Sequence, residues 1–404
     1  METLDVAIVG AGAAGLATAI FAARRNPSLA IALLDGAKKP GAKILVSGGG
    51  RCNVTNTVVT HRDFNGGSPN VVRRILDAFT AAHAADFFRE IGVPLHDEEN
   101  GKLFPDSNSA RTVLDALVGE ATRRGVRLLN GHRVTAVAPG FALDTSRGPI
   151  HARRVVLATG GLSLPKTGSD GTGYRIATSL GHTIVPTTPA LVALLLDGDF
   201  HPPLSGVALP VELSVRADGE KLRRISGDLL WTHFGVSGPA ALDASRVWLR
   251  GRNATVTANL LPPHDLASAD DRLLRAQPRG HLRTALSTLL PAKLADAVLA
   301  RLGLDGGTPM AHLARDDRRT LVRALLEWPL PVRDSRGYAH AEVTAGGIPL
   351  DEVDPATLES RRCPGLHLVG EILDVDGRLG GFNFQWAWSS ASVTAAALAA
   401  PARP

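Results

Sequence analysis

The sequence predicts an α/β protein whose first and last segments share one parallel sheet. A short apolar run, residues 6–9, leads directly into glycines with the G-x-G-x-x-G spacing. A second apolar run, 31–34, ends at an acidic residue, Asp35. Near the other end of the chain a third strand-like run, 366–369, again leads into a glycine-rich turn. Such strand ends, far apart in sequence, indicate a two-segment Rossmann-like fold that is interrupted by an insert.

The first glycine-rich turn is predicted to hold the pyrophosphate of a dinucleotide. Gly10 permits the tight turn, Gly12 allows a phosphate to approach the backbone, and Gly15 lets the following helix lie close to the sheet. That helix is expected to run to about Arg25, and its N-terminus directs partial positive charge at the phosphates. Asp35, twenty residues after Gly15, stands where a carboxylate accepts hydrogen bonds from ribose hydroxyls.

The same N-terminal stretch allows a second interpretation. Residues 6–23 carry no charge and have about the length of a marginal membrane span. They are rich in Gly and Ala rather than Leu and Ile, and a second strand follows them. Nucleotide binding is therefore the favoured interpretation.

Composition bounds the class of protein. The 404 residues suffice for two or three domains, and 44% hydrophobic with 21% charged residues is typical of a soluble globular protein. The net charge is +5, but no block of Lys and Arg is long enough to indicate a nucleic-acid-binding patch. Cys52 and Cys363 form no disulfide or metal pattern, so we expect a reducing cytoplasm and no metal site. A small-molecule substrate and no stable nucleic-acid or membrane partner are expected, and the oligomeric state is left open.

The loop 38–56 is the second informative stretch. Its three successive glycines, Gly48 to Gly50, are flanked by Ser47, Arg51 and Asn53, which brings backbone N–H groups and a cation to one place. Such a loop suits contact with a phosphate, a ribityl chain or a flavin ring. A merely flexible surface loop has no need of Arg, Cys and Asn at its exit. Cys52 is expected to be packed in the interior, because no resolving cysteine lies near it in sequence.

The stretch that follows is expected to alternate helices, strands and turns. Residues 70–91 have apolar side chains at helical spacing, and a helix is predicted over 113–124. The strand that begins near residue 153 leads into a glycine-rich turn, which returns the chain beside the dinucleotide. Three further glycines precede a helix over 174–180, so a second helix N-terminus is expected in the wall of the same pocket.

From about residue 189 the pattern changes to that of an insert. Short strand-like runs separated by Gly and Pro turns indicate a small β domain or barrel, and three or four helices follow. His233 lies in a turn inside the β part. The predicted segments are 1–188 and 344–404 for the nucleotide-binding domain, 189–262 for the first part of the β insert, 263–327 for a helical subdomain and 328–343 for the returning β strand.

The C-terminal segment decides the cofactor. After strand 366–369 come Gly370-Glu371, Asp374, Asp376 and a Gly380-Gly381 pair that opens the final helix. A plain NAD domain has no need of such a returning segment, whereas FAD is longer and is held at both ends. An acid after the strand can hold ribityl hydroxyls, and the helix N-terminus can face the flavin edge where negative charge collects on reduction. A segment that only closes the sheet would leave the acids and the Gly-Gly pair unexplained. We therefore predict FAD in a two-segment domain of the glutathione-reductase type.

The motifs together resemble those of a known family. VGAGAAGL, KKPGAKILVSGGGRCNVTN, ATGGLSLPKTGSDGTGYRIA, THFGVSGPA, EVTAGGI and GEILDVDGRLGGFNFQWAWSS occur in this order. They resemble the BaiN-like (YhiN-like) FAD-binding flavoproteins, which are also described as NAD(P)/FAD-dependent oxidoreductases or as an aminoacetone oxidase family. The resemblance spans nearly the whole chain and implies a two-segment FAD domain with an insert made of a β-barrel and a helical subdomain. Two positions depart from the family: Asp35 replaces a more usual Glu, and Leu164 stands where an aromatic residue is frequent.

The motifs and the resemblance together imply a set of FAD contacts. A strand near Val134 is typical of the adenine contact in two-segment flavoproteins, and that contact is made by the backbone. The complete set is Gly10, Gly12, Ala13, Ala14, Gly15, Asp35, Gly36, Lys43, Ser47, Gly48, Gly49, Gly50, Arg51, Cys52, Asn53, Val134, Thr159, Gly160, Gly370, Glu371, Asp374, Asp376, Gly380, Gly381, Phe382, Asn383 and Gln385.

The function expected from this site is that of a flavin oxidoreductase that moves a hydride between flavin N5 and a small organic substrate. A second G-x-G-x-x-G domain is absent from the sequence, so NAD(P)H, if used, must dock transiently near the flavin. Arg51 could bind an anionic or carbonyl oxygen and His233 could relay a proton, with Asn53 as a third catalytic candidate. Asn383 and Gln385 are further polar groups expected to face the substrate. Two alternatives stay open: a fumarate-reductase-like ene reductase that uses a catalytic Arg, and a flavin-dependent RNA-modifying or redox-sensing protein.

Overall fold

The computed structural model describes residues 3–219, 221–263 and 265–400. The chain divides into two compact units, Met1–Thr188 with Glu342–Pro404 and Pro189–Ala341. Each unit has its own cluster of buried hydrophobic side chains. The first unit therefore consists of two chain segments that are separated by the whole of the second unit.

A parallel sheet forms the centre of the first unit, with the strand order β7-β2-β1-β10-β20. Nearly all residues of β1, β2 and β20 are buried on both faces, as a sheet covered on both sides requires. β20 comes from the C-terminal segment and pairs with β10 through Val155 and Leu366. The two ends of the sequence thus build one sheet, as the sequence predicts. The strands are β1 (Leu4–Val9), β2 (Ile31–Asp35), β7 (Arg127–Asn130), β10 (Ile150–Leu157) and β20 (Leu366–Leu368).

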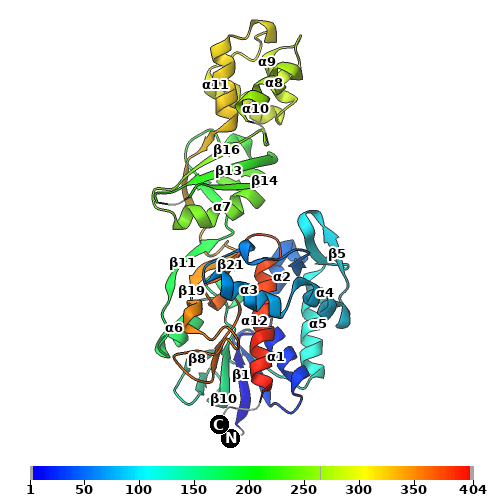
Figure 1. Ribbon diagram of the computed structural model, residues 1–404, viewed down its shortest axis with the longest axis vertical. Helices are drawn as coiled ribbons and strands as arrows, with labels where there is room; N and C mark the ends of the chain where they lie inside the picture. The colour runs from blue at the N-terminus through cyan, green and yellow to red at the C-terminus, as the bar shows by residue number, and fades with distance from the viewer. Residues whose placement is uncertain (1–2, 220, 264, 401–404) are drawn as a thin grey trace. The chain divides into compact units, whose positions relative to one another are not determined.

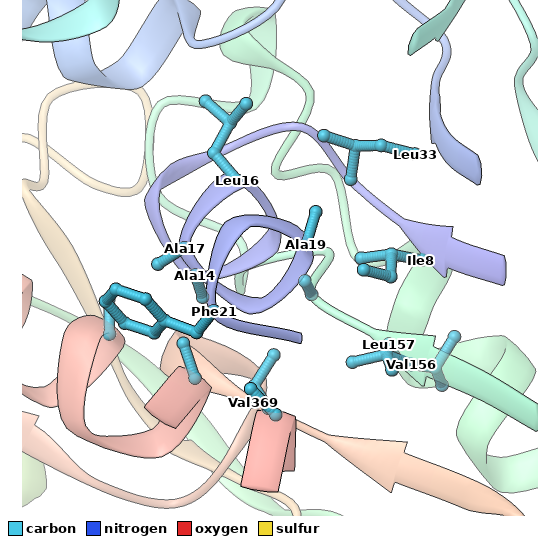
Figure 2. Packing of buried hydrophobic residues seen from close by; sticks show 14 of the residues in the cluster. Ile8, Ala14, Leu16, Ala17, Ala19, Phe21, Leu33, Val156, Leu157 and Val369 are labelled. Carbon is cyan, nitrogen blue, oxygen red and sulfur yellow. The ribbon is translucent and has the colours of Figure 1, made fainter. Parts of the chain in front are cut away.

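Two helices from opposite ends of the chain pack together beside this sheet. α1 (Ala13–Arg25) contacts α12 (Phe382–Ala399) along its length (Figure 1). α1 is rich in alanine, so the two backbones approach closely, and α12 is buried nearly all round. A buried Leu or Ile stabilises such a core by about 1.5–3 kcal/mol. Figure 2 shows the side chains that form this core around α1, with Ile8 of β1, Leu33 of β2, Val156 and Leu157 of β10, and Val369 beside β20.

The remaining elements of the first unit surround this centre. The predicted helical stretch 70–91 is two helices, because Phe79 is extended and the Thr80 side chain accepts a hydrogen bond from the His83 N–H. The helices are α2 (Ala42–Val46), α3 (Pro69–Ala78), α4 (Ala81–Glu90), α5 (Ala110–Arg123) and α6 (Thr172–Ser179). The outer strands are β3 (Thr55–Asn56), β4 (Phe64–Asn65), β5 (Leu95–Glu98), β6 (Lys102–Pro105), β8 (Val134–Val137), β9 (Ala142–Thr145) and β21 (Asp376–Gly377).

The chain leaves and re-enters the first unit at one place. β11 (Val185–Ala190), on the way out, pairs with β19 (Val343–Gly347), on the way back. The notional Cβ of Gly346 would lie 2.5 Å from the Pro186 carbonyl oxygen, so the two strands are in close contact. The second unit is therefore inserted between two neighbouring strands.

The second unit contains a seven-stranded antiparallel sheet, β17-β16-β13-β14-β15-β12-β18, and α7 (Pro239–Arg250) packs on β13 and β14. Trp231 is fully buried in its core. The strands are β12 (Leu194–Leu196), β13 (Ala208–Arg216), β14 (Arg223–Thr232), β15 (Gly235–Ser237), β16 (Thr255–Asn259), β17 (Trp328–Leu330) and β18 (Val332–Ser335). Four helices complete the unit: α8 (Leu266–Ala276), α9 (Leu282–Ser287), α10 (Ala292–Leu302) and α11 (Arg315–Leu326).

Candidate cofactor and active site

The candidate site lies at the carboxyl ends of the parallel strands. Because β1, β2, β10 and β20 run in the same direction, the residues that follow them meet at one edge of the sheet. These residues are Gly10 after β1, Asp35 at the end of β2, Thr159 after β10 and Gly370 after β20. Ligands of open α/β sheets bind at this edge. The predicted cofactor residues of both segments are thus brought together there.

The turn after β1 has the properties that a pyrophosphate requires. Gly10 has a φ of 104°, and a Cβ there would lie 2.4 Å from the Ala158 carbonyl oxygen. A Cβ on Gly15 would lie 1.9 Å from the Gly10 carbonyl oxygen, so the helix is tight against the turn. Gly12, by contrast, has no atom within 4 Å of a notional Cβ. The backbone at the start of α1 is therefore open on one side, where its N–H groups fit an anionic diphosphate.

Asp35 is fixed at the end of β2 by two backbone N–H groups. Its Oδ2 accepts from Ala11 N at 2.8 Å, and its Oδ1 accepts from Ala37 N at 2.7 Å. Each carboxylate oxygen has a second lone pair, which remains suited to a ribose hydroxyl. The adjacent Gly36 lies against Arg133, whose guanidinium bonds to Asp170 and to Thr172 at the start of α6. The predicted adenosine end thus adjoins Val134, the buried first residue of β8.

The strongest polar cluster at the strand ends joins four segments of the first unit. Lys43 Nζ lies 2.6 Å from Glu371 Oε2 and 2.6 Å from Ser163 Oγ. Ser163 Oγ also donates to Glu371 Oε1 at 2.8 Å, and the Thr344 N–H donates to that oxygen at 3.0 Å. Lys43 and Glu371 were predicted as cofactor residues. The residue pattern alone does not identify Ser163 and Thr344, although both lie in the glycine-rich motifs ATGGLS and EVTAGG, which are the available signal.

Arg51 pairs with a carboxylate of the β5–β6 hairpin, and its contact with a cofactor or substrate stays a prediction. Its Nη1 lies 2.6 Å from Glu98 Oε1, and its guanidinium stacks over the Phe104 ring at 4.1 Å from the centroid. The hydrogen bond from Arg51 lowers the pKa of Glu98. Arg51 therefore ties the glycine loop to the β5–β6 hairpin. The open side of that loop is at Gly49, where a notional Cβ would have no neighbour within 4 Å.

Asn53 and Gln385 make hydrogen bonds at the start of α12, and their contact with a substrate or cofactor stays a prediction. With its side-chain amide turned so that both neighbours are satisfied, Asn53 donates to Thr55 O at 2.8 Å and accepts from the Gly381 N–H at 3.0 Å. Gln385 is fully buried, accepts from Thr55 Oγ1 at 2.6 Å and donates to Phe79 O at 2.7 Å. Their hydrogen-bonding groups are used within the protein.

Cys52 is packed in the core, as expected. Its side chain is fully buried, and burial raises the pKa of its thiol to about 12. A contact from Cys52 to a cofactor would have to come from its backbone. The neighbouring Ser47 hydroxyl donates to Ile44 O at 2.7 Å, which closes α2.

The predicted C-terminal contacts form a rigid frame. Gly370 donates from its N–H to Ser390 Oγ at 3.0 Å and accepts from Trp386 Nε1 at 3.1 Å. Asn383 exchanges two hydrogen bonds of 2.9 Å with the backbone of Gly377. The side chains of Asp374, Asp376 and Phe382 are buried, and the Gly380 carbonyl accepts from Asn56 Nδ2 at 3.1 Å. These contacts fix the backbone between β20 and α12.

Thr159 and His233 belong to different units of the chain. Thr159 Oγ1 is buried and has no hydrogen-bond partner within the described ranges, and a Cβ on Gly173 would lie 1.8 Å from it, so this hydroxyl faces the start of α6. His233 is exposed in the two-residue turn between β14 and β15, in the second unit.

No cluster of three or more His, Cys, Asp or Glu suited to a metal occurs among the residues described. None of the described helices is long and apolar enough to span a membrane.

Curated relatives match the chain over nearly its whole length. It is 37% identical over 401 residues to the ribosomal RNA dihydrouridine synthase of Escherichia coli, with 97% of each chain covered. It is 33% identical over 395 residues to the 3-dehydro-bile acid delta(4,6)-reductase of Clostridium scindens, with 95% of this chain and 96% of the relative covered.

Solved structures show the same fold at lower identity. The 3-ketosteroid delta1-dehydrogenase of Sterolibacterium denitrificans has a TM-score of 0.50 and 13% identity, with 99% of this chain and 100% of that chain covered. A mutant quinol fumarate reductase of E. coli also has a TM-score of 0.50, with 18% identity and 98% and 70% covered.

A family model supports the same grouping. The model described as the HI0933-like protein Rossmann domain matches residues 4–397. The match includes the glycine turn, the acid at the end of β2 and the returning C-terminal segment, whose geometry fits FAD. The chain therefore belongs to the HI0933-like family of FAD-binding Rossmann proteins and is an FAD-dependent oxidoreductase.

Proposed function

We propose that this protein reduces a carbon–carbon double bond conjugated to a carbonyl group, and that its substrate is a uridine of ribosomal RNA. The observation that carries the proposal is the 37% identity over 97% of both chains with a protein named for that reaction. A second relative with the same name, from Haemophilus influenzae, is 34% identical over 393 residues.

The chemistry of the named relatives supports a common reaction class. The C5=C6 bond of uracil is conjugated to the C4 carbonyl, and the double bonds of a 3-oxo-4,6-diene steroid are conjugated to the C3 carbonyl. In both, a hydride adds to the carbon remote from the carbonyl and a proton adds to the carbon next to it. When FAD is bound and reduced, it supplies that hydride. We propose NAD(P)H as the source of electrons, so that one NAD(P)H and one proton convert one uridine to dihydrouridine.

The residues of the chain have a positioning role in this proposal. The Lys43–Ser163–Glu371 cluster holds α2, the turn after β10 and the turn after β20 in one arrangement. Because this helix and these two turns border the strand ends, the cluster orients both the cofactor-binding backbone and the substrate side of the site. Such fixed geometry supports hydride transfer by keeping the reacting atoms aligned.

The test uses the holoprotein and unmodified ribosomal RNA transcribed in vitro. The RNA is incubated anaerobically with NADH or NADPH and then digested. Mass spectrometry should find dihydrouridine at a position that is modified only when the enzyme is present. Unchanged RNA in the presence of a flavin that NAD(P)H does reduce would overturn the RNA substrate.

A second candidate function is reduction of a small steroid-like enone. It is favoured by the 33% identity with the bile acid reductase. Loss of the long-wavelength absorbance of a 3-oxo-4,6-diene steroid under the same conditions, without change in the RNA, would favour it.

A further inference from the structure

We propose that the tip of the β13–β14 hairpin and the turn after α7 together form a surface that binds the phosphate backbone of the RNA substrate. This inference rests on the proposed function and identifies the part of the protein that holds the RNA. The surface, called here the hairpin-tip patch, consists of Arg216, Lys221, Arg223 and Arg252, all of them exposed.

Sheet register and loop contacts bring these four residues together. Arg223 begins β14 opposite Val215, the neighbour of Arg216 on β13. The Asp218 N–H donates to the Arg252 carbonyl at 2.9 Å, so the turn after α7 lies against the hairpin. A Cβ on Gly251 would be 2.6 Å from Ala217 Cβ, which confirms that the two turns are in contact. Figure 1 shows β13, β14 and α7 in the same part of the second unit.

The charges of the patch are not neutralised by the protein. Within the described parts of the chain, none of the four side chains has an ion-pair or hydrogen-bond partner, whereas the adjacent Arg224 pairs with Glu212 at 3.3 Å. Asp218 already accepts from Asn253 Nδ2 at 2.7 Å. Residues 216–224 hold four basic and two acidic residues in sequence, and Arg252 adds a further cation from a separate segment. Among the described residues, the patch is therefore a net positive surface whose four cations make no ion pair.

The chemistry of the patch matches a nucleic-acid backbone. Guanidinium groups form bidentate hydrogen bonds with phosphate oxygens, and phosphate contacts supply most of the sequence-independent affinity for RNA. Leu222, 38% exposed between two of the cations, offers an apolar surface to a ribose or an unpaired base. No long Lys or Arg run exists in the sequence, because the patch is assembled from two turns that lie apart in sequence.

The arginines of α11 provide a matched control. Arg315, Arg319 and Arg323 are also exposed on one face of a helix in the same unit, but Asp316 and Asp317 lie beside them. The triple variant Arg216→Glu, Arg223→Glu, Arg252→Glu and the control Arg315→Glu, Arg319→Glu, Arg323→Glu change the net charge equally. Both are made in the full-length holoprotein. Circular dichroism and the thermal unfolding midpoint show whether the second unit of each variant is folded, and flavin content reports on the first unit.

The measurement is the affinity for in vitro transcribed ribosomal RNA at several salt concentrations. The hairpin-tip variant should bind at least about tenfold more weakly at physiological salt, and the slope of log K against log salt should fall by about 2–3, close to one per lost phosphate contact. The control should stay within about threefold of the wild type.

The outcomes separate this inference from the proposed function. In one outcome, the wild type binds and reduces the RNA while the hairpin-tip variant binds it as tightly as the control. In that case the patch does not bind the RNA, and the proposed function stands. If the wild type neither binds nor reduces the RNA, the proposed function fails and the patch fails with it. Binding of the wild type to phosphatidylserine vesicles but not to RNA would assign the patch to a membrane surface and overturn the inference.

Discussion

The fold tolerates a side chain at Gly12, whereas the predicted pyrophosphate does not. The φ of −83° and ψ of −167° at Gly12 are accessible to alanine, and a Cβ there would meet nothing within 4 Å. A methyl group would, however, occupy the space through which a pyrophosphate approaches the helix N-terminus. Gly12→Ala should therefore keep the thermal midpoint of the apoprotein within about 2 °C, since surface changes of this kind are near neutral. Its affinity for FAD should fall by about tenfold or more, because overpacking costs about 1–3 kcal/mol.

Gly15→Ala is the matched control for this prediction. Its Cβ would lie 1.9 Å from the Gly10 carbonyl oxygen, so the helix must move away from the turn and the apoprotein itself should be destabilised. Thermal unfolding and FAD titration of the two apoproteins distinguish the cases. A Gly12→Ala protein that binds FAD like the wild type would show that the pyrophosphate does not lie at this turn.

Lys43 is expected to hold the site together through Glu371. Lys43→Met keeps the length of the side chain but leaves the Glu371 carboxylate, 18% exposed, without its ion-pair partner. An uncompensated, partly buried charge costs about 1–3 kcal/mol, so FAD affinity should fall by about tenfold or more as the carboxylate reorients. Lys39→Met, at an exposed lysine of the same loop, should have little effect. Equal FAD affinities for the two variants, measured by titration, would remove Lys43 from the site.

Single residues also show what the sequence could not predict. The spacing of Gly10, Gly12 and Gly15 predicts the turn, since the steric requirement is local. The partner of Arg51 is Glu98, 47 positions away, and only the folded β5–β6 hairpin brings the two together. Gln385 is a polar residue of a type that often binds ligands. Its burial depends on Phe79, which lies between α3 and α4 and whose carbonyl accepts a hydrogen bond from the Gln385 amide. Residue type and spacing therefore identify candidates without identifying the atoms that those candidates contact.

At the scale of elements, α1 and α5 are joined by one buried carboxylate. Glu120, 4% exposed in its side chain, accepts hydrogen bonds from Arg24 of α1 at 2.7 Å and from Arg123 and Arg124 at 2.8 and 2.9 Å. Burial opposes its ionisation, but the bonds from the three arginines outweigh burial and lower the pKa of Glu120 to about 2. In the unfolded chain a glutamate has a pKa of about 4.3.

This difference predicts how the free energy of unfolding depends on pH. The folded state holds Glu120 ionised more strongly than the unfolded state, so the stabilisation is present above about pH 4.3 and is lost as the pH falls toward 2. Its size is about 2–3 kcal/mol, since one pKa unit corresponds to about 1.4 kcal/mol. In urea unfolding followed by circular dichroism, Glu120→Gln should be less stable than the wild type at pH 7, and the gap should narrow toward pH 3.

Glu90→Gln tests whether burial of the carboxylate is the reason for the expected loss of stability in Glu120→Gln. Glu90 also pairs with Arg24, at 3.0 Å, but its side chain is 63% exposed. Exposed ion pairs contribute about 0–1 kcal/mol, so this variant should stay close to the wild type at every pH. A loss as large as that of Glu120→Gln would show that the arginine, rather than the buried carboxylate, dominates the contact.

Elements are predicted well where their pattern is long and local. The strand–turn–helix of β1 and α1 and the strand β2 occur where apolar periodicity places them. The stretch 70–91 was predicted only as helical, because periodicity does not show that Phe79 becomes extended and that Thr80 begins a new helix. The pairing of β20 with β10 follows from two glycine-rich strand ends, whereas the two-residue strands β4 and β21 leave no periodic signal.

At the scale of the whole molecule, the insertion separates two cores. Every residue of the first hydrophobic cluster lies within Leu4–Ile184 or Ile348–Leu398, and every residue of the second lies within Leu194–Val332. The predicted FAD contacts all belong to the first unit, and the hairpin-tip patch belongs to the second. In the proposed function, cofactor binding and RNA binding are therefore carried by different units of one chain.

This division predicts that the first unit folds and binds FAD without the second. Because β11 and β19 pair directly, residues 191–340 can be replaced by a short Gly-Ser turn that joins two neighbouring strands without moving the parallel sheet. The loop that closes is then much shorter than the native insert, which lowers the entropy cost of bringing the two segments together. The shortened protein should be yellow, bind FAD within about tenfold of the full-length affinity, and bind ribosomal RNA far more weakly. A shortened protein that unfolds cooperatively but binds no FAD would show that the second unit completes the cofactor site, and one that retains full RNA affinity would place RNA binding in the first unit.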